Sequence, residues 1–277
     1  MPLVPMAQAV ATARPGGLAA FNVIQLEHAE AIVAGAEAAR RPVVLQISEN
    51  TVAFHGALAP LASACLRIAA GSSMPVVVHL DHAVSRELVT EAVEAGLPSV
   101  MFDASALGYD ENVAATAEVA QWCHERGAWV EAELGEVGGK DGVHAPGART
   151  DPGQAAKYVA ATGVDALAVA VGSSHAMVTR DARLDNALIT AIAAVAGVPL
   201  VLHGSSGVPD EGLVDAVRHG MVKINIATQL NKVLTGTVRA VLAADQTSVD
   251  PRKWMGPARS AVSAEAARLL TLLAGAN

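Results

Sequence analysis

Apolar runs rich in Val, Leu, Ile and Ala recur at regular intervals along the chain, and each has the length of a β-strand. Most lack the alternation of polar and apolar positions expected for a strand with one wet face, which is typical of parallel strands covered on both faces. About eight such runs occur, at residues 18–24, 42–48, 75–82, 99–105, 129–135, 166–172, 199–205 and 222–228. The series predicts a parallel sheet.

Ala-rich segments such as "LEHAEAIVAGAEAAR" and "ENVAATAEVAQWCHER" separate these runs, with apolar residues at helical spacing and Gly or Pro before the next strand. A doubly wound sheet would alternate in the same way. An unbroken series of about eight units without a linker favours a (β/α)8 TIM barrel. We therefore expect a single barrel domain over residues 1–277, with a C-terminal helical extension from about Pro257.

One connection departs from this regularity. Residues 135–152 read "GEVGGKDGVHAPGARTDP", far longer than a usual βα loop of roughly 2–6 residues. A long Gly-rich loop at the catalytic end of a barrel suggests a lid.

Polar residues gather where the predicted strands end, which is where barrel active sites lie. They are Asn22, Ser48, Asp81 with His82, Asp103 with Ser105, Glu131 with Glu133, Ser173 to His175, His203 with Gly204, and Asn225 with Thr228. A lone strand-end histidine is more often hydrogen-bonded at a polar rim than bound to metal. Three of them, His82, His175 and His203, close three different strands and could form an open zinc site.

The other histidines lie elsewhere in the pattern. His28, His55, His124 and His219 fall in or beside helical segments, and we expect ordinary surface or rim positions for them. His79 shares a strand face with Asp81 and could be a hydrogen-bond partner behind the site.

Composition narrows the class of ligand. The formal charge is -8, no Lys/Arg cluster is present and aromatic residues make up 3% of the chain, which argues against a nucleic-acid partner and favours a small polar ligand. Cys65 and Cys123 form no CxxC pair, no basic leader precedes the first strand and no apolar run is long enough to span a bilayer. We expect a cytoplasmic protein with no membrane partner.

Several longer motifs resemble one family. "HLDH", "SVMFDAS", "VEAELGEVGG", "GVDALAVAVGSSH", "LVLHGSSG" and "KINIAT" are similar, in order and spacing, to the motifs of class II fructose-bisphosphate/tagatose-bisphosphate aldolases, which are zinc-dependent (β/α)8 enzymes. The similarity runs from about Phe21 to "DPRKWMGPA". It implies a lyase of carbohydrate metabolism and glycolysis that cleaves a ketose 1,6-bisphosphate to dihydroxyacetone phosphate and an aldehyde, or condenses them.

The resemblance assigns roles to individual residues. His82, His175 and His203 would bind Zn2+, while Asp103 and Glu133 match carboxylates near the metal, although structural roles for both acids are nearly as plausible. Asp81 would carry the proton of the hydroxyl at the broken bond. Neighbouring strand residues normally point to opposite faces, so Asp81 and His82 can share a site only if the strand geometry relaxes. The alternative, that Asp81 caps the next helix, is weaker because Ser85 is the better N-cap.

Phosphate recognition is expected in "HGSSGVPDE" and "NIAT", at the loops after the last two strands. Pro209 suits the first turn of a helix whose positive end faces an anion. Tight turns and a helix cap would explain either segment alone. By resemblance the contacts come from Gly204, Ser205, Ser206, Asn225, Ile226, Ala227 and Thr228, with Ser48 as a further phosphate contact and with Asn22 and Ala176 beside the substrate.

The chain also departs from the family pattern. The loop "GGxE" is "GGKDG" here, which leaves Asp141 in the place of the glutamate base, with His144 as the next candidate. Ala176 and Ser205 replace two glycines. Glu131 points the same way as Glu133, and we expect one of the two to pair with a cation such as Lys223.

Other functions stay open at this point. Lys223 is the only lysine on a predicted strand and could serve a Schiff-base aldolase, but it lies near the start of its strand. A sugar-phosphate sensor without catalysis and a metal aldolase for another phosphorylated substrate, such as an inositol-derived acid phosphate, are further alternatives. The Ala-rich helices suggest a homo-oligomer, a dimer or tetramer, and the family suggests a monovalent cation (Na+ or K+) near the phosphate.

Overall fold

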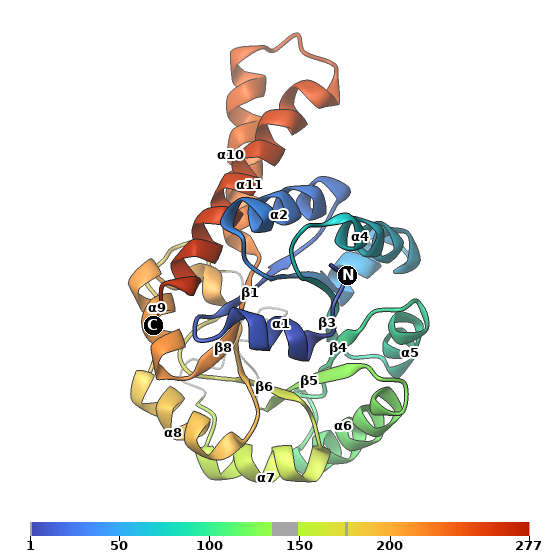
Figure 1. Cartoon of the computed structure of the whole chain (residues 1–277), viewed down its shortest axis with the longest axis vertical. Helices are drawn as coiled ribbons and strands as arrows, with labels where there is room; N and C mark the ends of the chain where they lie inside the picture. Colours follow the sequence, from blue (N-terminus) through green and yellow to red (C-terminus); the bar gives the residue numbers. More distant parts are fainter. Residues whose placement is uncertain (1, 135–148, 175–176, 277) are drawn as a thin grey trace.

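The computed structural model describes residues 2–134, 149–174 and 177–276. Eight parallel strands follow one another in chain order and close into a barrel, because β1 pairs with β8 as well as with β2 (Figure 1). The strands are β1 (Leu18–Asn22), β2 (Val43–Ser48), β3 (Val76–Ala83), β4 (Ser99–Phe102), β5 (Trp129–Leu134), β6 (Ala166–Val169), β7 (Leu200–Leu202) and β8 (Met221–Ile226). The predicted TIM barrel is confirmed.

Helices surround the barrel and connect consecutive strands (Figure 1). They are α1 (Met6–Ala13), α2 (Leu26–Ala39), α3 (Glu49–His55), α4 (Ala59–Gly71), α5 (Arg86–Glu94), α6 (Tyr109–His124), α7 (Pro152–Thr162), α8 (Asn186–Ala196), the 3-10 turn η1 (Ser205–Gly207), α9 (Asp210–His219), α10 (Thr228–Ala244) and α11 (Pro251–Ala274). Side-chain caps fix several helix starts, and the predicted cap at Ser85 is confirmed, since its side-chain oxygen accepts the Leu88 amide proton.

Each strand has one face toward the helices and one toward the barrel interior. Val43, Leu45 and Ile47 of β2 belong to the apolar layer between strands and helices. Val44 and Gln46 alternate with them and are equally buried, because their side chains point into the barrel. The interior therefore contains polar side chains that are fully removed from solvent.

Helix α1 closes the N-terminal end of the barrel. Its buried residues, among them Met6 and Val10, pack against Leu18, Val44 and Val77 near the starts of three strands, and Trp129 at the start of β5 joins the same apolar cluster. Figure 1 shows α1 lying across the barrel centre. The interior is closed at this end by packed side chains.

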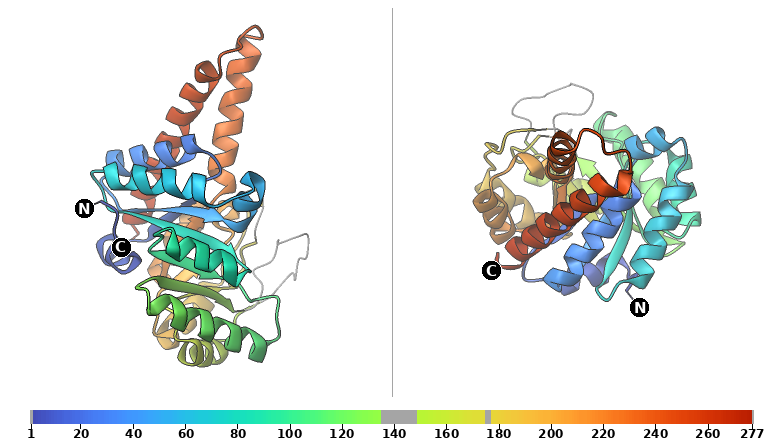
Figure 2. Two further views of the ribbon diagram at one scale, coloured as in Figure 1. Left: turned by 90° about the vertical axis from the view of Figure 1, so that its right-hand side faces the viewer. Right: turned by 90° about the horizontal axis from the view of Figure 1, so that it is seen from above.

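Helices α10 and α11 form an antiparallel hairpin that projects beyond the barrel (Figure 2). The later part of α11 packs closely on α2, where a Cβ on Gly35 would lie 2.7 Å from the Ser263 carbonyl oxygen. The predicted helix start near Pro257 is wrong, since α11 begins at Pro251 and contains Pro257. Asp250 caps the helix by accepting the Arg252 amide proton, and proline is well suited to a first turn, so the start lies at Pro251 rather than near Pro257.

Cys65 in α4 and Cys123 in α6 are buried free thiols. Within the described residues, no single helix has both the length and the apolar composition to cross a bilayer, and only the bent pair of α3 and α4 passes that test together.

Candidate active site

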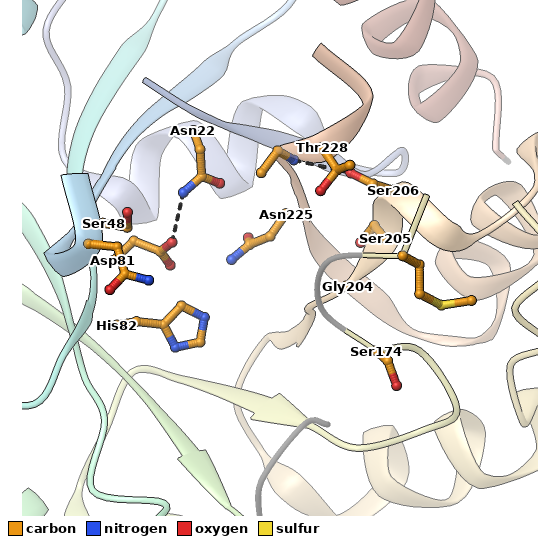
Figure 3. A pocket seen from close by; sticks show the side chains of 13 residues that line it. Asn22, Ser48, Asp81, His82, Ser174, Gly204, Ser205, Ser206, Asn225 and Thr228 are labelled. Carbon is orange, nitrogen blue, oxygen red and sulfur yellow. Dashed lines mark hydrogen bonds between the residues drawn. The ribbon is translucent and has the colours of Figure 1, made fainter. Parts of the chain in front are cut away.

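A pocket of about 170 Å³ opens at the C-terminal ends of the strands (Figure 3). The residues that line it are Asn22, Ser48, Asn50, Asp81, His82, Ser174, Met177, Gly204, Ser205, Ser206, Asn225, Ala227 and Thr228. Most of the substrate residues expected from the sequence are therefore brought together. Ile226 is the exception among the described ones, because its side chain is buried in the apolar layer outside the strands.

Asp81 and His82 reach the same pocket because β3 is distorted at its end. His82 has a left-handed backbone, with φ of 52°, and the pairing of β3 with β4 shifts register between Leu80 and Ala83. Such a conformation costs a non-glycine residue about 1–2 kcal/mol, so it persists only where the surroundings enforce it. The relaxation of strand geometry that the sequence required is present.

The Asp81 carboxylate is held by a row of amides. Asn22 Nδ2 donates to Asp81 Oδ2 at 3.0 Å, and Gln46 Nε2 donates to Asn22 Oδ1 at 3.0 Å. Burial opposes ionisation of Asp81, but the positive charges of His82, Lys223 and His203 more than offset it and hold its pKa well below the ordinary value. Asp81 is thus an oriented, ionised carboxylate.

Histidines and carboxylates meet at the floor of the pocket. His82 Nδ1 lies 2.7 Å from Asp103 Oδ2, and His203 Nδ1 lies 3.2 Å from Glu133 Oε2. The two imidazole rings are edge to face, with their centroids 4.6 Å apart. Asp81, His82 and His203 form one group whose possible ligand atoms all lie within 4.8 Å of one another, and His82, Asp103 and Glu133 form a second. Imidazole nitrogens and carboxylate oxygens at this spacing fit a zinc ion.

Beneath His203 lies a chain of buried charges. His203 Nε2 is 3.1 Å from Glu131 Oε1, and Lys223 Nζ donates to Glu131 Oε2 at 2.8 Å. The predicted pairing of a β5 glutamate with Lys223 is confirmed. Burial lowers the basicity of His203, but hydrogen bonds to Glu131 and Glu133 outweigh it and raise the pKa of His203 to about 9. A metal ion bound to Nδ1 of His203 would displace the proton that this nitrogen carries in the charged imidazole.

His79 lies deeper in the barrel. Its Nδ1 is 2.8 Å from the Ser99 hydroxyl, and its Nε2 is 3.9 Å from Glu131 Oε2. Burial and the neighbouring Lys223 lower the pKa of His79 to about 3, so this imidazole is neutral.

The opposite wall of the pocket consists of two segments at helix starts. Gly204 has φ of 67° and leads into η1. Ser206 Oγ accepts the amide proton of Ala227 (Figure 3) and also that of Gln229, both at the start of α10. Helix starts attract anions through their free amides and the helix dipole. None of the described residues lining the pocket is Lys or Arg, so helix amides and hydroxyls are the groups on this wall that can donate hydrogen bonds to an anion.

Comparison with known proteins assigns the family. The sequence profile described as "Fructose-bisphosphate aldolase class-II" matches residues 4–277. This chain belongs to the class-II fructose-bisphosphate aldolase family. It is 38% identical over 268 residues to a fructose-bisphosphate aldolase of Staphylococcus aureus, covering 95% of this chain and 94% of that protein. A fructose-bisphosphate aldolase of Geobacillus stearothermophilus is 40% identical over 248 residues, which is 88% of this chain and 86% of that one.

Solved structures agree with this family. The YdjI aldolase from Escherichia coli K12 superposes with a TM-score of 0.86 at 31% identity, over 98% of this chain and 97% of that chain. A fructose-bisphosphate aldolase from Campylobacter jejuni, 20% identical with a TM-score of 0.80 over 96% of this chain and 92% of that one, shares the fold. The protein is thus an aldehyde-lyase of class II.

In this aldolase the β6–α8 connection packs directly on the β7–η1 turn. A Cβ on Gly204 would lie 2.5 Å from the Ser174 carbonyl carbon, and one on Gly207 would lie 2.5 Å from the Met177 sulfur. Arg180 Nε and Nη2 donate to the Val208 carbonyl, and its Nη2 also reaches Asp210, which pairs with Arg268 of α11. This wall of the pocket is therefore tied to the β6–α8 connection and, through Asp210, to α11.

Some predicted site residues lie outside the described part of the chain. These are the third histidine, His175, its neighbour Ala176, and the loop residues Asp141 and His144, together with most of the expected lid. The position of His28 was predicted wrongly: it is 3% exposed rather than on the surface, because it faces inward from the first turn of α2. His55, His124 and His219 are exposed, as predicted.

Sequence reasoning also missed residues of the site. Gln46, Asn50 and Met177 were not expected there. Gln46 could have been found from strand alternation, because it points to the same side of β2 as Ser48. The apolar side chain of Met177 carries no such signal.

Proposed function

We propose that this class-II aldolase is zinc-dependent and cleaves a ketose 1,6-bisphosphate, fructose or tagatose, to dihydroxyacetone phosphate and an aldehyde, and also catalyses the reverse condensation. The observation that carries the proposal is the placement of an ionised aspartate, Asp81, beside a histidine–carboxylate cluster and opposite a wall of helix-start amides. A substrate that fits this arrangement has a phosphate at one end and adjacent ketone and hydroxyl oxygens in the middle.

His82 and His203 would hold the metal, together with His175, which lies outside the described residues. Asp103 at His82 and Glu133 at His203 orient the two rings, since a carboxylate on one ring nitrogen fixes the imidazole tautomer and its direction. When bound here, zinc supplies a Lewis acid for the ketone half of the substrate.

Asp81 is the proton carrier of the proposed reaction. In the cleavage direction it accepts the proton of the hydroxyl on the carbon that becomes the aldehyde. The carbon–carbon bond then breaks, and its electron pair stays with the ketone half. Asn22 holds the carboxylate toward the pocket, so that the acceptor oxygen needs little reorganisation. Asp141 of the 135–152 loop would return a proton to the ketone half, in the place of the family's glutamate.

The phosphate of the ketone half would bind at Gly204 to Ser206 and at Asn225 to Thr228. Ser206 already accepts two amide protons of α10, so its hydroxyl proton is available to a phosphate oxygen. Ser48 on the opposite side of the pocket would contact the second phosphate. A monovalent cation beside the first phosphate would add positive charge to a wall whose described residues include neither Lys nor Arg.

The decisive experiment is release of dihydroxyacetone phosphate from fructose and tagatose 1,6-bisphosphates. The protein is assayed as purified, after chelation, and after return of Zn2+ or, as a control, Mg2+. We expect activity that chelation removes and Zn2+ restores, and the ratio of kcat/KM for the two sugars ranks them. Absence of product with either sugar from zinc-loaded protein would reject the proposal. Calorimetric binding of a sugar bisphosphate without turnover would instead indicate a sensor.

We further infer that the enzyme acts in the cytoplasm, in glycolytic carbohydrate metabolism, as a homo-oligomer. The absence of paired cysteines and the acidic charge support the first point. The many small side chains on the outer helices support the homo-oligomer. Sedimentation of the purified chain tests the oligomer, and a monomer at micromolar concentration would reject it.

A further inference from the structure

Three ionisable side chains form a continuous chain inside the barrel, below the pocket floor. Glu131 and His203 have no solvent exposure, and Lys223 is 2% exposed. Taking such charges out of water costs several kcal/mol per ion, so a buried ion pair is a poor device for stability alone. Apolar side chains of similar size would fill the same space, as they do in the adjoining layer of Val201, Ala166 and Ala168. The charges therefore call for another explanation.

The distances define which atom carries each proton. Lys223 Nζ donates to Glu131 Oε2 at 2.8 Å, which leaves Glu131 Oε1 to face His203 Nε2 at 3.1 Å. A carboxylate can only accept here, so the proton between them belongs to His203 Nε2. In the neutral imidazole the lone pair is then on Nδ1, the ring nitrogen on the side of Glu133. Because Glu131 occupies Nε2, Nδ1 is the nitrogen left for the group that His203 forms with Asp81 and His82.

Lys223 has a specific place in this arrangement. It binds the oxygen of Glu131 that His203 does not use, so it fixes the direction of the carboxylate as well as its charge. The other nearby ring, His79, does not supply this support, because its Nδ1 is hydrogen-bonded to Ser99 and its Nε2 is 3.9 Å from Glu131. Without Lys223, the Glu131 charge would be buried against one imidazole alone.

We propose that Glu131 and Lys223 are positioning residues that hold His203 with its proton on Nε2, so that Nδ1 is the nitrogen presented to the metal. The inference rests on the proposed zinc function. Neither Glu131 nor Lys223 is among the residues that line the pocket. Each acts through the orientation of a metal-binding imidazole, the kind of support that typically contributes 10- to 100-fold to metal affinity.

The test measures zinc affinity in three variants by competition with a chromophoric chelator. In E131Q the amide nitrogen, which can only donate, faces either Lys223 or His203, and so one of these two donors loses its acceptor. In K223M, Glu131 loses its neighbouring cation. We expect each to weaken zinc binding about 10- to 100-fold. In E131Q/K223M the glutamine oxygen can accept from His203 Nε2 with no ammonium competing, so zinc affinity should recover above that of E131Q.

S99A is the matched control, because it removes a buried hydrogen bond to His79 in the same layer without touching His203. Its zinc affinity should equal that of the wild type. The visible absorption of the Co2+-substituted proteins gives a second readout, since a change of ligand geometry alters the d–d bands, whereas a general loss of stability does not. Thermal unfolding of the metal-free proteins identifies any variant that fails to fold. If E131Q fails to fold, K223M still tests the proposal.

The outcomes separate the two proposals. Wild-type protein that binds no zinc would overturn the proposed function. Wild-type protein that binds zinc, with E131Q and K223M binding equally tightly and with unchanged Co2+ spectra, would overturn the positioning role alone. Weaker binding in both single variants with normal binding in S99A supports it.

Discussion

Replacing Gly204 by alanine tests whether the contact between the β6–α8 connection and the β7–η1 turn determines catalysis. Gly204 has φ of 67°, and a left-handed conformation costs a residue with a Cβ about 1–2 kcal/mol. A chain of this length has an unfolding entropy of about 0.6 kcal/mol/K, so this backbone term alone lowers Tm by roughly 2–3 °C.

The steric clash of the new Cβ should affect catalysis more than the backbone cost does. The new Cβ would lie 2.5 Å from the Ser174 carbonyl carbon, and an ordinary contact needs at least 3.4 Å. Ser174 or the turn must therefore move by about 0.9 Å, and backbone atoms cannot avoid this by changing rotamer. Misplacement of catalytic groups by about 1 Å can cost on the order of 100-fold in rate. We expect kcat/KM of G204A for the ketose bisphosphate to fall by about that factor.

G197A is a matched control for the backbone cost. Gly197 also has a left-handed φ, 72°, but no atom lies within 4 Å of the added Cβ, and the residue follows α8 at the opposite end of the barrel. Both variants are compared by thermal unfolding and by steady-state release of dihydroxyacetone phosphate. The two should lose similar stability, while only G204A loses activity. Equal kcat/KM in the two variants would refute the steric reasoning.

Three further results are expected. D81N removes the proton carrier without changing its size, so kcat should fall about 10²- to 10⁴-fold with little change in KM, measured by steady-state kinetics; a loss below threefold would contradict the role of Asp81. Zinc at 100 times its Kd should stabilise the chelator-treated protein by about 2.7 kcal/mol, or roughly 4–5 °C in Tm by calorimetry, and no shift would argue against a zinc site. Partial burial opposes ionisation of Asp210, but hydrogen bonds from Arg268 and Arg180 outweigh it and hold the pKa of Asp210 below its ordinary value. Its contribution to stability is therefore present above pH about 4 and is lost as the pH falls toward the lowered pKa. In urea titrations at pH 7 and at pH 4 and below, D210N should be less stable than the wild type at pH 7, with the difference narrowing in acid; a constant difference would reject this contribution.

The sequence predicted the barrel because strands covered on both faces must be apolar throughout, and that pattern is visible without a structure. It predicted the ends of strands less well. The predicted runs at 166–172 and 199–205 continue past the ends of β6 and β7, because Ala170 to Gly172 and His203 to Ser205 lie beyond the paired residues of these strands. Apolar composition alone does not distinguish a paired residue from a buried one beside the pocket.

The site was predictable where strand alternation or a family motif indicated it. The left-handed backbone of His82 was not, since nothing in the local sequence specifies it, although two site residues in succession required some distortion. The contact of Glu131 with His203 joins β5 to β7, which are not neighbours in the sheet. It depends on which strands face one another across the interior of the closed barrel. The pattern of apolar and polar residues along the sequence does not contain this information.

Helix α1 has a consequence for the order of events in turnover. Among the described residues, the side chains of α1 fill the N-terminal end of the barrel, and the pocket opens at the strands' C-terminal ends, so we expect substrate and products to pass through that opening. In the proposed complex the ketone half lies at the histidine–carboxylate cluster on the pocket floor, so we expect it to depart after the aldehyde half. The two products of cleavage should therefore be released in sequence. The product that leaves second should inhibit competitively with respect to the ketose bisphosphate.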